Sequence, residues 1–167
     1  IARLEKSSPG WNMTGVQGDA TSGSVTIERI IWPVFYLHWR SFEKAGAGPA
    51  LDALAAAGFL HKLWDEDAID SLGEAKEITL PSHPAFRFEA GTGHGNRTTR
   101  YIVWACPQSG RLFAADMNLD LRTATPLSLI DWQEEMARTV RCHPDGSIEK
   151  FPRLSKRREI PEVGVSY

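Results

Sequence analysis

The sequence contains only two cysteines, Cys106 and Cys142, among its 167 residues. This number is too small for a fold that several disulfides hold together. The pair can form one disulfide or remain as two buried thiols, and the sequence leaves both alternatives open. A disulfide would favour an extracytoplasmic protein and free thiols a cytoplasmic one, so the localisation is left unassigned.

Long apolar runs, an excess of positive charge and known catalytic motifs are also absent. The longest apolar run, residues 30–37, is interrupted by Pro33 and predicts no membrane span. A net charge of −2 gives no electrostatic footprint for nucleic acid. No G-x-S-x-G nucleophile motif occurs, and we assign neither a catalytic residue nor a cofactor.

Most of the chain consists of short apolar segments separated by turns. Residues 1–24 are rich in Gly, Ser and Thr and predict an irregular N-terminal segment that can include one edge strand. The clearest signal is at residues 100–119, where two apolar segments flank a Pro-Gln-Ser-Gly turn and predict a hairpin. Runs of β-branched and aromatic residues predict further strands at residues 25–31, 34–40, 75–80 and 85–90.

On the predicted strand at residues 34–40, alternate side chains divide between two faces. Phe35, Leu37 and Trp39 share one face, and Tyr36, His38 and Arg40 share the other.

Two helices are predicted from apolar residues at intervals of three and four. Pro49 begins the first helix, which Gly58 can split, and Thr125 caps the second before Pro126. The first helix has the apolar stripe Leu51, Ala55, Phe59 and Leu63, and the second has Leu129, Trp132, Met136 and Val140.

These elements together predict an α+β fold. Strands joined by short loops are antiparallel, so we expect a mainly antiparallel sheet with one polar face and one apolar face. Two principal helices pack on this sheet in an α/β/α-type sandwich. Residues 1–143 then form a single α+β domain, and residues 144–167 form an extended C-terminal tail.

The cysteines mark the first candidate site. Cys106 ends the first strand of the hairpin, and Cys142 follows the second helix, so a disulfide between them would tie that helix to the sheet. A metal site could instead use Cys106, Cys142, His143 and either His83 or His94. No close pair of the C-x-x-C or H-x-x-x-H type supports a metal, so none is assigned.

Three further residues are candidates for ligand binding. The glycine-rich segment at residues 91–97 resembles a phosphate loop, but a strand follows it where a helix would be needed, which favours a hairpin loop. His94 and Arg97 in this loop remain candidates because exposed loop residues often contact ligands. Arg111 beside the hairpin turn can pair with an acid or bind an anion.

The segment WACPQSGRLF, followed by a helix that ends at Cys142, resembles the α/β/α sandwich superfamily of extrinsic photosystem II subunits, Ran-binding import factors and small bacterial lipoproteins. The resemblance covers residues 100–143 and implies a non-catalytic module that binds or steadies a larger assembly.

Six tryptophans and two irregular chain ends also favour a protein partner. We therefore expect a non-catalytic accessory or binding module, as a subunit of a larger protein assembly. The alternative is a small-ligand or metal-binding protein, or an enzyme of that kind, that uses the region around Cys106, Cys142 and His143.

Overall fold

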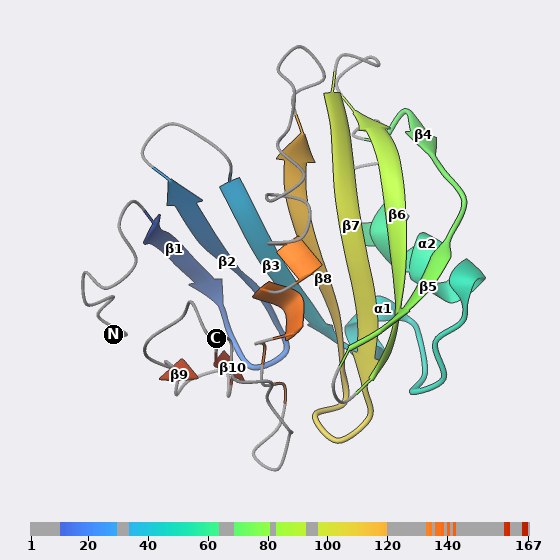
Figure 1. Cartoon of the computed structure of the whole chain (residues 1–167). Helices are drawn as coiled ribbons and strands as arrows, with labels where there is room; N and C mark the ends of the chain where they lie inside the picture. The colour runs from blue at the N-terminus through green and yellow to red at the C-terminus, as the bar shows by residue number, and fades with distance from the viewer. Residues whose placement is uncertain are drawn as a thin grey trace.

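The computed structural model contains one eight-stranded antiparallel sheet, a separate two-stranded sheet and few helices (Figure 1). The fold is therefore α+β or mainly β in the part of the chain that is described. The structure describes residues 11–29, 34–63, 69–80, 83–92, 97–119, 133–134, 136–138, 140, 142, 159–160 and 165–166.

Two antiparallel meanders make up the large sheet. The first contains β1 (Trp11–Gly18), β2 (Ser22–Arg29) and β3 (Val34–Ser41), and the second contains β6 (Pro84–Thr92), β7 (Arg97–Cys106) and β8 (Arg111–Leu119). Pairing of β3 with β8 joins the two meanders and gives the order β1-β2-β3-β8-β7-β6-β4. The short strands β4 (Ser71–Leu72) and β5 (Lys76–Thr79) both pair with β6.

Two helices follow β3. Ser41 caps α1 (Phe42–Ala45) by accepting a hydrogen bond from the Lys44 N–H, and Gly46, with φ 63°, ends it. The helix α2 (Ala53–Leu63) starts after Asp52, whose Oδ1 accepts a hydrogen bond of 2.7 Å from the Ala55 N–H. The predicted start at Pro49 was therefore too early, and Gly58 does not split the helix.

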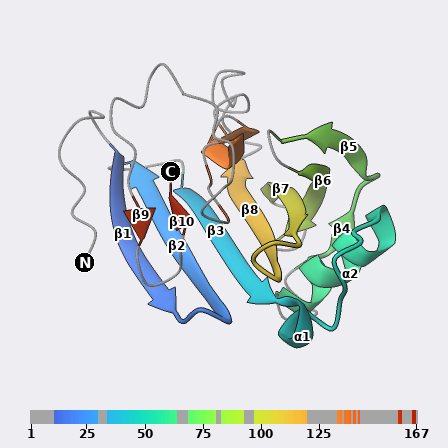
Figure 2. The same ribbon diagram turned by 90° about the horizontal axis from the view of Figure 1, so that it is seen from below.

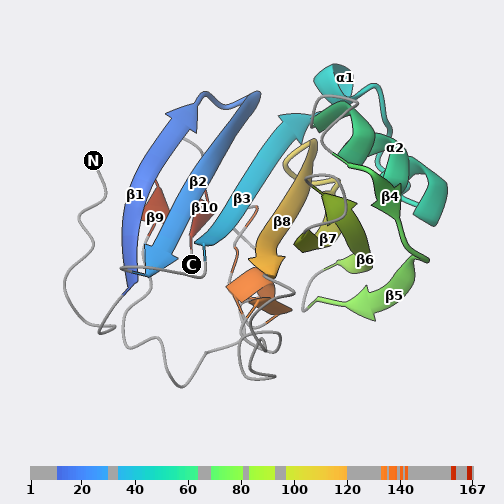
Figure 3. The ribbon, with the colours of Figure 1, turned by 90° about the horizontal axis from the view of Figure 1, so that it is seen from above.

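Both faces of the sheet bury apolar side chains. The α2 helix packs against one face, and Met136, Ala137, Val140 and Cys142 pack against the other; Figures 2 and 3 show the two sets of helical residues on opposite sides of the sheet. The prediction of one polar face was wrong, because Ile102, Val103 and Trp104 are all buried although successive residues point to opposite faces.

Among the described residues of this second layer, 133, 134 and 136–138 are helical. Gln133 Nε2 donates hydrogen bonds to the backbone oxygens of Arg100, at 2.8 Å, and Ala115, at 3.3 Å. Met136 is buried, and Glu134 forms an ion pair with Arg87 of β6. Val140, the last residue of the predicted apolar stripe, is described but is not helical, and the part of the predicted helix before residue 133, including Thr125 and Trp132, lies outside the described residues.

The predicted strands differ from the observed ones mainly at their ends. The predicted irregular N-terminal segment contains β1 and the start of β2, and β4 was not predicted. Within the predicted tail, β9 (Glu159–Ile160) pairs with β10 (Val165–Ser166). No helix among the described residues has the length and apolar character needed to cross a membrane.

Candidate metal centre

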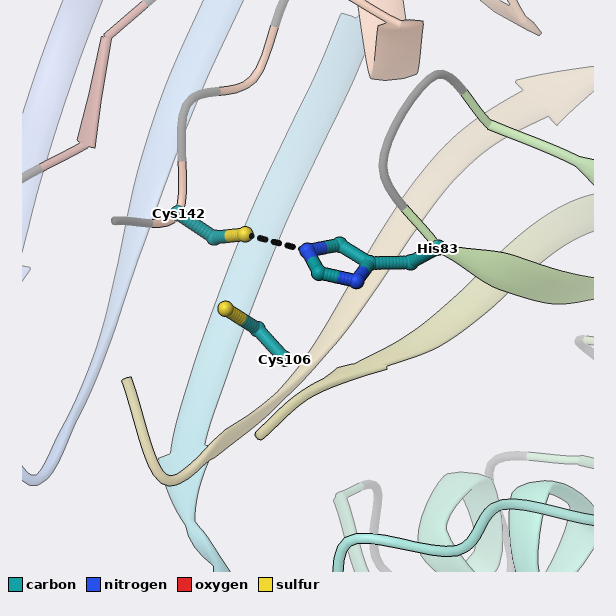
Figure 4. A group of neighbouring side chains, drawn as sticks. All are labelled: His83, Cys106 and Cys142. Carbon is teal, nitrogen blue, oxygen red and sulfur yellow. Dashed lines mark hydrogen bonds between the residues drawn. The ribbon is translucent and has the colours of Figure 1, made fainter. Parts of the chain in front are cut away.

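Three potential metal ligands from distant parts of the sequence converge on one face of the large sheet. They are His83 before β6, Cys106 at the end of β7, and Cys142 after the second helical layer (Figure 4). The ring nitrogen and the two Sγ atoms all lie within 4.8 Å of one another. The exposed fractions of these residues are 7%, 0% and 4%, so water has little access to the cluster.

Local structure fixes each of the three side chains. The backbone N–H of Leu80 donates to His83 O at 3.0 Å, and the N–H of His83 donates to Leu80 O at 3.3 Å, which closes a tight turn between β5 and β6. Strand alternation places Cys106 on the same face as Trp104. Cys142 packs in the same apolar cluster as Met136. The ligands therefore belong to a packed core.

The thiols of the two cysteines interact with each other and with the imidazole. His83 Nε2 lies 2.9 Å from Cys142 Sγ. A hydrogen bond from the Cys142 thiol, followed by one from His83, lowers the pKa of Cys106 below its ordinary value. The same interaction between the sulfurs, together with burial, raises the pKa of Cys142. The interaction between the sulfurs therefore acts in opposite directions on the two thiols.

This arrangement suits a metal ion better than a disulfide. Thiolate sulfur and imidazole nitrogen are the ligands that zinc prefers, at about 2.3 and 2.0 Å respectively, which separates neighbouring ligand atoms by roughly 3.5–3.8 Å. The three ligand atoms lie within 4.8 Å of one another, and His83 Nε2 and Cys142 Sγ, 2.9 Å apart, would move slightly apart to admit an ion. Cys106 and Cys142 are free thiols in the structure and are not at disulfide distance, so the candidate disulfide is not formed.

The other predicted site residues have different positions. Arg111 opens β8 directly opposite Cys106, and its positive charge acts to lower the pKa of Cys142. Arg97 opens β7, and its backbone pairs with that of Thr92, as expected for a hairpin. The Arg97 side chain and the whole of His94 and His143 lie outside the described residues.

A second polar pair, not predicted from the sequence, is formed by His38 and Asp116. These residues lie on the opposite face from the cysteines, with His38 Nε2 3.0 Å from Asp116 Oδ1. Burial raises the pKa of Asp116, and the hydrogen bond from His38 opposes this rise. The alternation of residues 34–40 correctly placed His38 on its face, but no local pattern indicated a partner on β8.

Comparison with known proteins identifies no relative. No protein-family model, no curated protein and no solved structure matches the chain. The resemblance to the α/β/α sandwich superfamily stays a prediction. The site is therefore interpreted from its own geometry and chemistry.

Proposed function

We propose that this chain is a metal-binding domain in which His83, Cys106 and Cys142 hold a zinc ion. The observation that supports this function is the convergence of the three buried ligand atoms within 4.8 Å. Metal binding was the alternative function expected from the sequence, after the non-catalytic accessory module. The histidine that lies beside the two cysteines is His83.

The chemistry of the ligands favours zinc over other common ions. Calcium and magnesium bind through oxygen atoms, and the cluster of His83, Cys106 and Cys142 offers none. Iron–sulfur clusters use four cysteines as a rule, and the sequence has two. Two thiolates and a neutral imidazole would match the two positive charges of Zn²⁺, which compensates the cost of burying charge.

Burial of the ligands favours a structural role for the ion. Catalytic zinc sites keep an open position for water, whereas structural sites have four protein ligands. The described residues supply three, and His143, next to Cys142 in the sequence, is the candidate to test as the fourth. The ion would fasten the segment that ends at Cys142 to the hairpin that contains Cys106.

The first experiment measures zinc content and cobalt spectra of the purified protein. We expect one zinc per chain, and charge-transfer and d–d absorption bands of a tetrahedral thiolate site after replacement by Co²⁺. Cys106→Ser, Cys142→Ser and His83→Gln each remove one ligand, so zinc content should fall and the cobalt spectrum should change. His61→Gln is the matched control, because His61 is exposed on α2 and away from the cluster.

A protein that binds no metal would give a clearly different result. Protein isolated without metal, with two thiols that titrate freely and no absorption bands on addition of Co²⁺, would contradict the proposed function. His143→Gln addresses the fourth ligand separately. We expect it to weaken zinc binding while the thiolate bands remain.

The other expectations from the sequence stay predictions. A non-catalytic accessory subunit would co-purify with a protein partner and elute with it in size-exclusion chromatography of a native extract. The complete α/β/α sandwich requires a second principal helix that extends from Thr125, and site-directed spin labels along residues 125–140 would measure its periodicity.

A further inference from the structure

A second polar site lies on the opposite face of the sheet from the cysteines. It is a hollow of about 440 Å³ between β2, β3 and the two helices α1 and α2. Its lining includes Ser22 and Ser24 of β2, His38 and Arg40 of β3, Lys44 of α1 and Leu63 of α2. Figure 3 shows α1 and α2 together beyond the end of β3 on this side.

The strand register explains why the polar side chains gather here. Ser24 is the cross-strand neighbour of His38, and Ser22 is the neighbour of Arg40. Directly opposed residues in an antiparallel pair have side chains on the same face, about 5 Å apart at Cβ. The four residues therefore form a compact polar patch, and Lys44 approaches it from α1, with its Nζ 3.1 Å from Ser22 Oγ.

The two cations of this patch retain hydrogen-bonding capacity. Arg40 donates from Nη1 to the backbone oxygen of Lys62 at 2.8 Å, and Lys44 donates to Ser22. An arginine side chain has five N–H donors and a lysine has three, so both can donate further. No carboxylate forms an ion pair with either cation among the residues that the structure describes.

Two acids, Asp116 and Asp19, lie near the patch. Asp116 receives the hydrogen bond from His38. Asp19 accepts hydrogen bonds from Thr21 and from the Ser22 N–H, and these bonds, led by that of the Thr21 hydroxyl, lower its pKa to about 2. The charge of Asp19 also interacts with that of Lys44, so the hollow presents two cations, two serine hydroxyls and one nearby carboxylate that already accepts three hydrogen bonds from neutral donors.

We propose that this hollow binds a small phosphate-bearing molecule, with its phosphate group held between Lys44 and Arg40. A phosphate offers at least three acceptor oxygens and up to two negative charges, which suits two cations and two serine hydroxyls better than a carboxylate does. The volume exceeds what a phosphate group alone requires, and Leu63 provides an apolar wall for the rest of the molecule.

Calorimetric titration with inorganic phosphate, glycerol 3-phosphate and acetate tests this proposal. We expect both phosphates to bind more tightly than acetate. Lys44→Gln and Arg40→Gln should each weaken phosphate binding about tenfold, the effect of losing one charge-assisted hydrogen bond. Arg40→Lys retains the positive charge and should lose less affinity than Arg40→Gln.

The matched control is Lys76→Gln, which removes the same charge from an exposed lysine on β5. Equal weakening by Lys76→Gln would indicate attraction to net charge alone and would overturn the proposal. Acetate that binds as tightly as phosphate would also overturn it, as would the absence of phosphate binding at millimolar concentration. Cys106→Ser should leave phosphate affinity unchanged, because the metal ligands lie on the other face of the sheet.

Discussion

The buried acidic groups on the two faces of the sheet have pKa values shifted in opposite directions. Hydrogen bonds from Cys142 and His83 lower the pKa of the Cys106 thiol. Asp116 is deeply buried, and His38 only partly offsets the cost of removing its charge from water. The pKa of the first group is therefore lowered, and that of the second is raised.

The raised pKa of Asp116 gives a prediction about stability and pH. The native state holds the Asp116 proton more tightly than the unfolded state, whose carboxyl has the ordinary pKa of 3.8. The stabilising contribution is therefore complete below pH 3.8 and is lost as pH rises through the native pKa. Asp116→Asn removes this titration and keeps the shape of the side chain.

We therefore expect the wild type to lose stability relative to Asp116→Asn as pH rises from 3.8. Urea unfolding of both proteins across this range measures the difference in free energy of unfolding. A difference that is constant with pH, or that favours the wild type as pH rises, would refute the assignment of a raised pKa to Asp116.

At the scale of elements, Gly23 sets how closely the β1–β2 hairpin can pack. A Cβ atom at Gly23 would lie 2.3 Å from the backbone oxygen of Gln17 and 2.3 Å from Cζ2 of Trp39. Trp39 is fully buried, and its Nε1 donates a hydrogen bond of 2.8 Å to Asp19 O. Neither neighbour can move without disturbing the pairing of these strands.

Two glycine substitutions compare this crowded site with an open one. Gly23→Ala should destabilise the protein by roughly 1–3 kcal/mol, because the added methyl group overpacks a rigid site. Gly58→Ala should instead stabilise it by up to about 1 kcal/mol, because a Cβ there meets nothing within 4 Å and alanine favours a helix. Thermal and urea unfolding measure both effects, and the same sign for both variants would contradict this account.

At the scale of the whole molecule, the proposed ion would link three distant segments. Unfolding would separate His83, Cys106 and Cys142 and release the metal, so zinc should stabilise the fold. A zinc concentration one hundred times the Kd corresponds to about 2.7 kcal/mol. A chelator should lower the thermal midpoint of the wild type but leave that of metal-free Cys142→Ser unchanged. Equal chelator effects on both proteins would argue against a structural ion.

Local features of the fold could be predicted from the sequence, and contacts between distant segments could not. The β7–β8 hairpin was predictable because both strands and their turn are contiguous and strongly apolar. The cysteines were considered together because they are the only two in the sequence. His83 could not be chosen over His94, because its position depends on the turn at Leu80 and on the register of β6 with β7.

The pairing of β3 with β8 has a consequence for folding. Each meander forms from neighbouring segments, but this one pairing must bring together strands that residues 42–110 separate. Contacts of such long range form slowly, because closing the intervening loop costs conformational entropy before any stabilising contact between the strands is made. Until they form, the edges of β3 and β8 are unpaired, and the apolar side chains of two half-sheets face solvent. We therefore expect closure between β3 and β8 to limit the folding rate, and aggregation to compete with refolding before it occurs.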